Sequence, residues 1–170
     1  MPKPPRSILV VDDDDAVRET IRSLLDDEGF TVTTAATGLE ALDLVEARKF
    51  DLAVVDIHLK DEFDGIDLVQ HARSQQPGLR SLFISGLYSR ATDDPDRDDF
   101  VSKPFRPHEL LGCVWELLHR KVPEPANDSI LLHARRAILA AKIDCLRNRR
   151  GRRVEDADTA AADNSAATPP

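Results

Sequence analysis

The chain has 170 residues, 41% of them hydrophobic, and a formal net charge of −8, which suits one ordinary domain with an appendage. Its two cysteines, Cys113 and Cys145, show neither a disulfide framework nor a CxxC pair, so we expect reduced thiols in a cytosolic protein. The first residues, MPKPPRS, precede only the short apolar run ILVV, so we expect no signal peptide and no membrane span.

Charge is distributed unevenly along the chain. Residues 1–129 carry 15 Lys/Arg and 26 Asp/Glu, a net charge of −11, whereas residues 130–153 carry 8 and 1, a net charge of +7. The last stretch, 154–170, carries 4 acidic residues and no basic one. An acidic body is not typical of a nucleic-acid binder, although the basic segment leaves that function open.

Short apolar runs alternate with helix-period segments along the body. The run Ile8–Val11 ends at four aspartates, and apolar residues then recur at helical spacing until Gly29. The next expected strands are Thr31–Ala35, Leu52–Val55, Ser81–Ser85 and Phe100–Ser102. The expected later helices are one opened by a Thr37–Glu40 capping box, one over Ile66–Arg73 and one over about His108–Arg120. The fourth crossover, LYSRATDDPDRDD, lacks apolar periodicity, so any helix there should be short.

Repeated strand–helix–strand units predict an α/β fold, in which helices cover both faces of a five-stranded parallel sheet. The acid pair Asp12-Asp13 follows the first strand and Asp56 follows the third. These acids can meet only if the two strands are neighbours. We therefore expect the flavodoxin-like, doubly wound strand order 2-1-3-4-5, with a crevice between strands one and three.

The chain beyond the body is expected to differ from it. We predict that the body covers 1–122 and is followed by a linker at 123–129, an amphipathic basic helix at 130–150 and a disordered tail at 151–170. The apolar stripe of this helix must be covered by the body, a second copy or a partner, and we expect homodimerisation or partner docking. A phosphoacceptor role for His133 is disfavoured, because its setting, LLHARRAI, has no acidic neighbour.

Polar residues suited to metal and phosphate chemistry follow the strand ends. They are Asp12 and Asp13 after ILVV, Asp56 after LAVV, Ser85 after SLFI and Lys103 in VSKPF. The carboxyl ends of parallel strands open onto one edge of the sheet, where ligands bind. Phosphoryl transfer needs a nucleophile, charge neutralisation and in-line positioning. Asp56 is the expected nucleophile, because it stands alone at the end of the central strand.

A Mg²⁺ site is expected at the same edge. Its ligands would be Asp12, Asp13, Asp56 and a backbone carbonyl at His58, an oxygen set that Mg²⁺ accepts. The acid pair alone would equally suit a helix N-terminus, which acidic residues stabilise. The metal site is favoured because Asp56, Ser85 and Lys103 also follow the carboxyl ends of predicted strands.

Two side chains are expected to contact the phosphoryl oxygens. Lys103 would supply a point charge, and the hydroxyl of Ser85 would donate a hydrogen bond. A lone lysine would indicate only a surface residue, but Lys103 lies at a strand end before Pro104. For His58, two residues after Asp56, the sequence fits a role in phosphoaspartate hydrolysis and a solvated loop histidine equally well.

The segments VVDDDDAVR, VVDIHLKDEFDGIDL, FISGLY and FVSKPF, in this order, resemble the receiver domain of two-component response regulators over about residues 6–121. The resemblance implies that Asp56 takes phosphate from a histidine kinase or phosphotransfer protein, with Mg²⁺ held by the acid pair. It implies that the hydroxyl and lysine sense the phosphate, and that Phe100 is the aromatic switch of a signalling face. FISGLY is also similar to the Phe-Ala-Thr-Gly-aliphatic-Tyr signature of a subgroup of mostly stand-alone receivers.

The sequence departs from the family pattern in a few places. Lys60 stands where a proline is usual, in a loop that is one residue longer before Asp64. Ser85 replaces threonine and keeps the hydroxyl, whereas Phe100 lacks the phenol hydroxyl of the usual switch tyrosine.

Three functions remain open on the sequence. The favoured one is a cytoplasmic phosphoacceptor of a bacterial phosphorelay, not a conventional enzyme, which signals to an unknown target through protein–protein contacts. The alternative is a regulator of transcription or another nucleic-acid binder, acting through the basic helix at 130–150. The third, a receiver-like adaptor that works without phosphorylation, is disfavoured by the intact site.

Overall fold

The computed structural model describes residues 5–60, 64–86, 98–121, 139–141 and 143–148. Within them, five parallel strands form one sheet in the order β2-β1-β3-β4-β5. The strands are β1 (Ser7–Val11), β2 (Thr31–Ala35), β3 (Leu52–Asp56), β4 (Arg80–Ser85) and β5 (Asp98–Ser102). This arrangement confirms the predicted flavodoxin-like order and the doubly wound α/β class.

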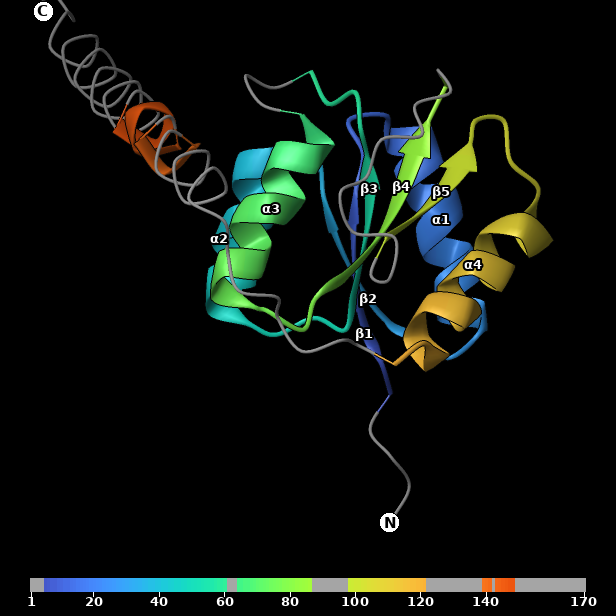
Figure 1. Ribbon diagram of the computed structural model, residues 1–170. Helices are drawn as coiled ribbons and strands as arrows, with labels where there is room; N and C mark the ends of the chain where they lie inside the picture. The colour runs from blue at the N-terminus through green and yellow to red at the C-terminus, as the bar shows by residue number, and fades with distance from the viewer. Residues whose placement is uncertain (1–4, 61–63, 87–97, 122–138, 142, 149–170) are drawn as a thin grey trace, which may run out of the picture. The chain divides into compact units, whose positions relative to one another are not determined.

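Helices cover both faces of the sheet (Figure 1). Helices α1 (Asp15–Asp27) and α4 (Pro107–His119) pack on one face, and α2 (Gly38–Ala47) and α3 (Gly65–Gln75) pack on the other. Alternate strand residues explain both layers, because successive side chains of a strand point to opposite faces. Ile8 and Val10 pack with α1 and α4 in one core, and the intervening Leu9 is buried as well.

Strand register brings the ends of β1 and β3 together. Val11 of β1 pairs with Val55 of β3, so Asp12 and Asp56 each come one residue later on neighbouring strands. Asp56 in turn pairs with Ile84 of β4, one residue before Ser85. All five residues of β3 are buried, as expected for the central strand of a covered parallel sheet.

Local signals at the helix ends act largely as predicted. Gly29 ends α1 with a φ of 83°, a left-handed conformation that glycine adopts without a steric penalty. Thr37 caps α2, where its Oγ1 accepts a hydrogen bond from the Glu40 backbone N–H at 3.1 Å. The carboxylate of Glu40 accepts from the N–H of Ala36, one residue before the cap, at 2.9 Å. The strand predicted from Phe100 begins two residues earlier, since an edge strand need not be apolar.

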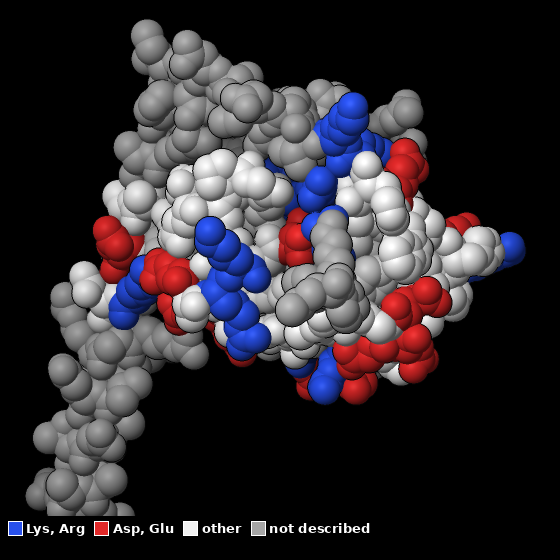
Figure 2. All heavy atoms as spheres, turned by 90° about the horizontal axis from the view of Figure 1, so that it is seen from below, with Lys and Arg blue, Asp and Glu red and all other residues white. Residues whose placement is uncertain are grey.

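At the end of the sheet where the strands begin, ion pairs and hydrogen bonds join neighbouring strands and loops. Arg6 pairs with Asp51 at 2.6 Å, which joins the start of β1 to the start of β3. The buried amide of Gln76 accepts from the Phe50 N–H at 2.9 Å and donates to the Arg48 carbonyl at 2.7 Å. Figure 2 views this end and shows both acidic and basic side chains of described residues on it.

Residues Ser129–Pro170 form a second compact unit, separate from Met1–Asp128. Its described residues are helical at 139–141 and 143–148, which confirms an additional helix within the predicted range. The predicted linker at 123–129, His133, the tail at 151–170 and most of the fourth crossover lie outside the described residues, so their assignments stay predictions. Among the described helices, none combines the length and apolar character needed to cross a membrane.

Candidate functional site

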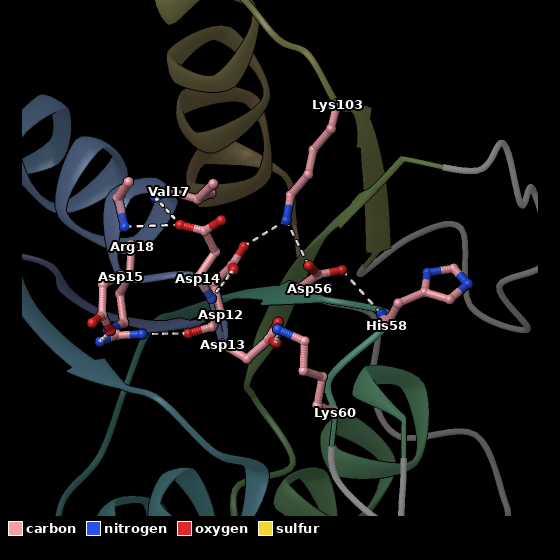
Figure 3. Close-up of polar contacts among 11 residues, drawn as sticks. Asp12, Asp13, Asp14, Asp15, Val17, Arg18, Asp56, His58, Lys60 and Lys103 are labelled. Carbon is pink, nitrogen blue, oxygen red and sulfur yellow. Dashed lines mark hydrogen bonds and ion pairs between the residues drawn. The ribbon is translucent and has the colours of Figure 1, made fainter.

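Four consecutive aspartates follow β1 and divide into two pairs. Asp14 caps α1, and its carboxylate accepts hydrogen bonds from the backbone N–H groups of Ala16 and Val17, which lower its pKa. Asp15 lies in the first turn and forms an ion pair with Arg18. These two residues serve the helix N-terminus. Asp12 and Asp13 point instead toward β3 (Figure 3), so the metal-site interpretation applies to them.

Asp12, Asp13 and Asp56 form what we call the acid cluster. Each offers one carboxylate oxygen, and these three atoms all lie within 4.8 Å of one another. Asp12 is only 1% exposed and Asp56 only 7% exposed. Three carboxylates at this separation repel one another, and burial deepens the cost because water screens them poorly. The arrangement therefore calls for positive charge.

Lys103 supplies part of that charge. Its backbone N–H donates to the Ser85 carbonyl at 2.8 Å, which fixes the residue beside the end of β4. Its Nζ donates to Asp12 Oδ2 at 2.7 Å and to Asp56 Oδ2 at 2.5 Å (Figure 3). Burial alone would lower the pKa of Lys103, but these two hydrogen bonds outweigh it and raise the pKa. Lys103 is therefore a fixed ammonium that bridges two buried carboxylates.

The pKa of Asp12 is also raised. Burial is the main cause, and the hydrogen bond from Lys103 opposes it without reversing it. The Asp12 Oδ1 accepts from the Asp14 backbone N–H at 2.9 Å, so both oxygens of this carboxylate are engaged. Ionised Asp12 is thus held in place at an energetic cost, which a divalent cation would relieve.

Ser85 and His58 lie on the β4 side of Asp56. Ser85 is 4% exposed, and its Oγ lies 3.4 Å from Nδ1 of His58. The backbone N–H of His58 donates to Asp56 Oδ1 at 2.9 Å, and Figure 3 shows its ring pointing away from the acid cluster. The structure thus places His58 in contact with Asp56, and Ser85 next to His58, one residue after the strand partner of Asp56. The predicted ligand role of the His58 carbonyl stays a prediction.

Phe100 occupies a different place. It pairs in register with Phe83 of β4, and the two rings stack with centroids 5.4 Å apart and an interplanar angle of 29°. Phe100 is half-buried, so its ring fills space between neighbouring strands. This contact does not test the predicted switch role of Phe100, which stays a prediction.

Two residues of the site went unpredicted. Lys60 Nζ lies 2.6 Å from Asp13 Oδ2, which adds a second cation to the acid cluster. Gly65, the first residue of α3, approaches β3 so closely that a Cβ there would lie 2.3 Å from the Asp56 carbonyl oxygen. For Lys60, the sequence did offer a signal, because a lysine stands where the family usually has a proline. Nothing in the sequence gives the close approach at Gly65.

The acid cluster fits a hard divalent cation. Its donors are all carboxylate oxygens, the class of ligand that Mg²⁺ prefers. Asp13 Oδ2 is buried, and its one close polar contact among the described residues is the ion pair with the exposed Lys60. A buried carboxylate oxygen with an unused lone pair is suited to a metal ion. Asp12, Asp13 and Asp56 would hold it.

Comparisons with known proteins agree with this geometry. The family described as "Response regulator receiver domain" matches residues 8–114. The chain is 36% identical over 129 residues to response regulator MprA of Mycobacterium bovis, with 74% of this chain and 56% of that protein covered. The chain thus spans little more than half the length of the curated relatives that it matches.

Solved structures give the same fold. Response regulator TrrA of Thermotoga maritima, in complex with Mg²⁺ and BeF, is 30% identical, with a TM-score of 0.59 over 66% of this chain and 98% of that one. A Burkholderia pseudomallei response regulator with a phosphorylated aspartic acid and a calcium ion is 30% identical, with a TM-score of 0.57 over 63% and 65%. The chain belongs to the response regulator receiver domain family of two-component systems.

Proposed function

We propose that Asp56 accepts a phosphoryl group from a histidine kinase or phosphotransfer protein in a Mg²⁺-dependent reaction. The observation that carries the proposal is the contact geometry of Asp56. Its carboxylate ends the central strand, lies within the acid cluster, and is hydrogen-bonded on Oδ2 by Lys103 and on Oδ1 by the His58 backbone. A nucleophile held at both oxygens beside a cation site is positioned for in-line transfer.

The proposed reaction is a simple displacement. A carboxylate oxygen of Asp56 attacks phosphorus, a P–O bond forms, and the P–N bond of the donor phosphohistidine breaks, with its electrons and a proton from solvent going to the imidazole. Lys103 Nζ, 2.5 Å from Asp56 Oδ2, is placed to contact a phosphoryl oxygen once that acyl phosphate exists. Ser85 would donate its hydroxyl to another. Mg²⁺, when bound, would supply charge neutralisation.

Two of the solved relatives support this proposal. TrrA was solved with Mg²⁺ and BeF, and the Burkholderia pseudomallei protein carries a phosphorylated aspartic acid together with a calcium ion. Both proteins therefore combine a divalent cation with a phosphorylated aspartate or a beryllium fluoride ligand. The acid cluster of this chain offers three carboxylate oxygens, the class of ligand that such cations prefer.

The proposal is tested by labelling with acetyl phosphate or a phosphohistidine donor in the presence of Mg²⁺. Asp56→Asn should abolish labelling, because an amide oxygen cannot replace the carboxylate as nucleophile. The matched control is Asp27→Asn, which makes the same change at an exposed residue of α1 and should label as wild type. Undiminished labelling of the Asp56→Asn protein would refute the assignment.

We further propose that the phosphorylated chain signals through protein contacts, with the basic helix predicted at 130–150 as a docking or dimerisation element. The support is the charge contrast, +7 over residues 130–153 against −11 over 1–129, which favours binding to acidic protein surface at low salt. Truncation after Val122 should leave a protein that is still phosphorylated but differs in sedimentation or target binding. Salt-dependent DNA binding lost on truncation would favour the nucleic-acid alternative instead.

A further inference from the structure

The acid cluster carries an ammonium group besides that of Lys103. Lys60 lies four residues after Asp56, and its Nζ is 2.6 Å from Asp13 Oδ2. Its side chain is 86% exposed, whereas the Asp13 side chain is only 18% exposed. The lysine therefore extends from a solvent-exposed position to a mostly buried carboxylate (Figure 3).

We propose that Lys60 is a tethered competitor of the metal ion, which occupies Asp13 in the metal-free protein and must move away for Mg²⁺ to bind. The proposal rests on the Mg²⁺ site proposed above. It assigns Lys60 a role in setting how tightly that site holds the cation.

The two lysines of the site differ in what holds them. Lys103 donates to two carboxylates, Asp12 and Asp56, and its side chain is 23% exposed. Lys60 has one ion-pair partner among the described residues, Asp13, and this contact raises the pKa of Lys60, so the lysine is a charged ammonium. An exposed ammonium with one such contact exchanges it for water at little cost. Lys60 is thus the cation that can leave, and Lys103 the one that stays.

Mg²⁺ and Lys60 compete because both use the same carboxylate. Asp13 is one of only three carboxylates that converge at the site in the described part of the chain. A dication bound to Asp13 would lie within a few ångströms of the ammonium, and like charges at that distance repel. Each binding event must therefore break the contact between Lys60 and Asp13, which weakens the apparent Mg²⁺ affinity.

The test is calorimetric titration of the full chain with Mg²⁺. Lys60→Met removes the charge and keeps an unbranched side chain, and it should tighten Mg²⁺ binding by about two- to five-fold, as expected for a mostly exposed ion pair. Lys60→Arg keeps the charge and should stay close to wild type. The control is Lys49→Met, which removes one charge at an exposed position between α2 and β3, at the opposite end of the sheet.

Each outcome separates the two proposals. Tighter binding in Lys60→Met, with Lys49→Met unchanged, supports competition at Asp13. Equal tightening by both methionine variants would indicate a general charge effect and overturn the inference. Mg²⁺ binding that Lys60→Met leaves unchanged would overturn it as well, while the proposed function stands. If no variant and no wild-type protein bound Mg²⁺, the proposed metal site would fail, and this inference with it.

Discussion

The buried and the exposed sides of the acid cluster are built differently. On the buried side, Asp12 and Asp56 follow paired strands and share one bridging ammonium, that of Lys103. On the exposed side, Asp13 meets a solvent-exposed lysine through a single ion pair. The sheet therefore fixes the chemistry on one side, whereas the other side can exchange its cation. Changes on the buried side should affect folding and reaction, and changes on the exposed side should affect mainly metal affinity.

The largest effect is expected at Gly65, where α3 meets the buried side. A Cβ there would lie 2.3 Å from the Asp56 carbonyl oxygen and 2.8 Å from Val55 Cγ1. Backbone cannot yield as a flexible side chain can, so Gly65→Ala should lower the free energy of unfolding by about 2 kcal/mol or more. Urea denaturation measures this loss.

The matched control for that prediction is Gly112, an exposed helical residue of α4. An added Cβ there meets nothing within 4 Å, so Gly112→Ala should raise the free energy of unfolding by about 0.5–1 kcal/mol. If Gly65→Ala were as stable as wild type while Gly112→Ala behaved as expected, α3 would not be held against Asp56 as described.

A smaller and more selective effect is expected at Asp13. Asp13→Ala should weaken Mg²⁺ binding by at least about ten-fold, because one of three carboxylate ligands is lost. Without metal it should unfold no more easily than wild type, because repulsion within the cluster falls. Calorimetry with Mg²⁺ and urea denaturation in chelator measure the two quantities. If Asp13→Ala bound Mg²⁺ as tightly as wild type, or lost much metal-free stability, the buried and exposed sides of the acid cluster would not differ as described.

The smallest effect is the pH dependence contributed by Asp12. Burial raises the pKa of Asp12 above 3.8, so the folded protein binds this proton more tightly than the unfolded chain. The contribution of Asp12 to metal-free stability should therefore fall as pH rises from 3.8 through the higher folded-state pKa, and level off above it. The difference in unfolding free energy between wild type and Asp12→Asn isolates this term. A pH-independent difference would contradict the burial of an ionised Asp12.

The strand ends were predictable because each apolar run stops at a polar residue, which marks where the strand leaves the core. The sequence places Asp12, Asp56, Ser85 and Lys103 each at a strand end, and parallel pairing then gathers them at one edge without further information. Gly29 and Thr37 likewise act through local backbone chemistry that a sequence displays. These parts of the fold depend on neighbours in the chain.

Contacts across space were not predictable in the same way. The approach of Gly65 to Asp56 depends on how α3 lies against β3, a packing distance that no periodicity encodes. The pairing of Lys60 with Asp13 joins two loops, and a single lysine in a loop usually indicates only solvation. The two acids that serve α1, Asp14 and Asp15, became distinct from the metal pair only once the position of the helix start was known.

The central claim, that Asp56 is the phosphoacceptor, is tested most directly by locating the phosphoryl group in the unaltered chain. After incubation with acetyl phosphate and Mg²⁺, borohydride reduces an acyl phosphate to an alcohol, and tandem mass spectrometry finds the modified position. The account predicts reduction at position 56 alone, dependent on Mg²⁺. Reduction at Asp12 or Asp13, or no modification at all, would contradict it.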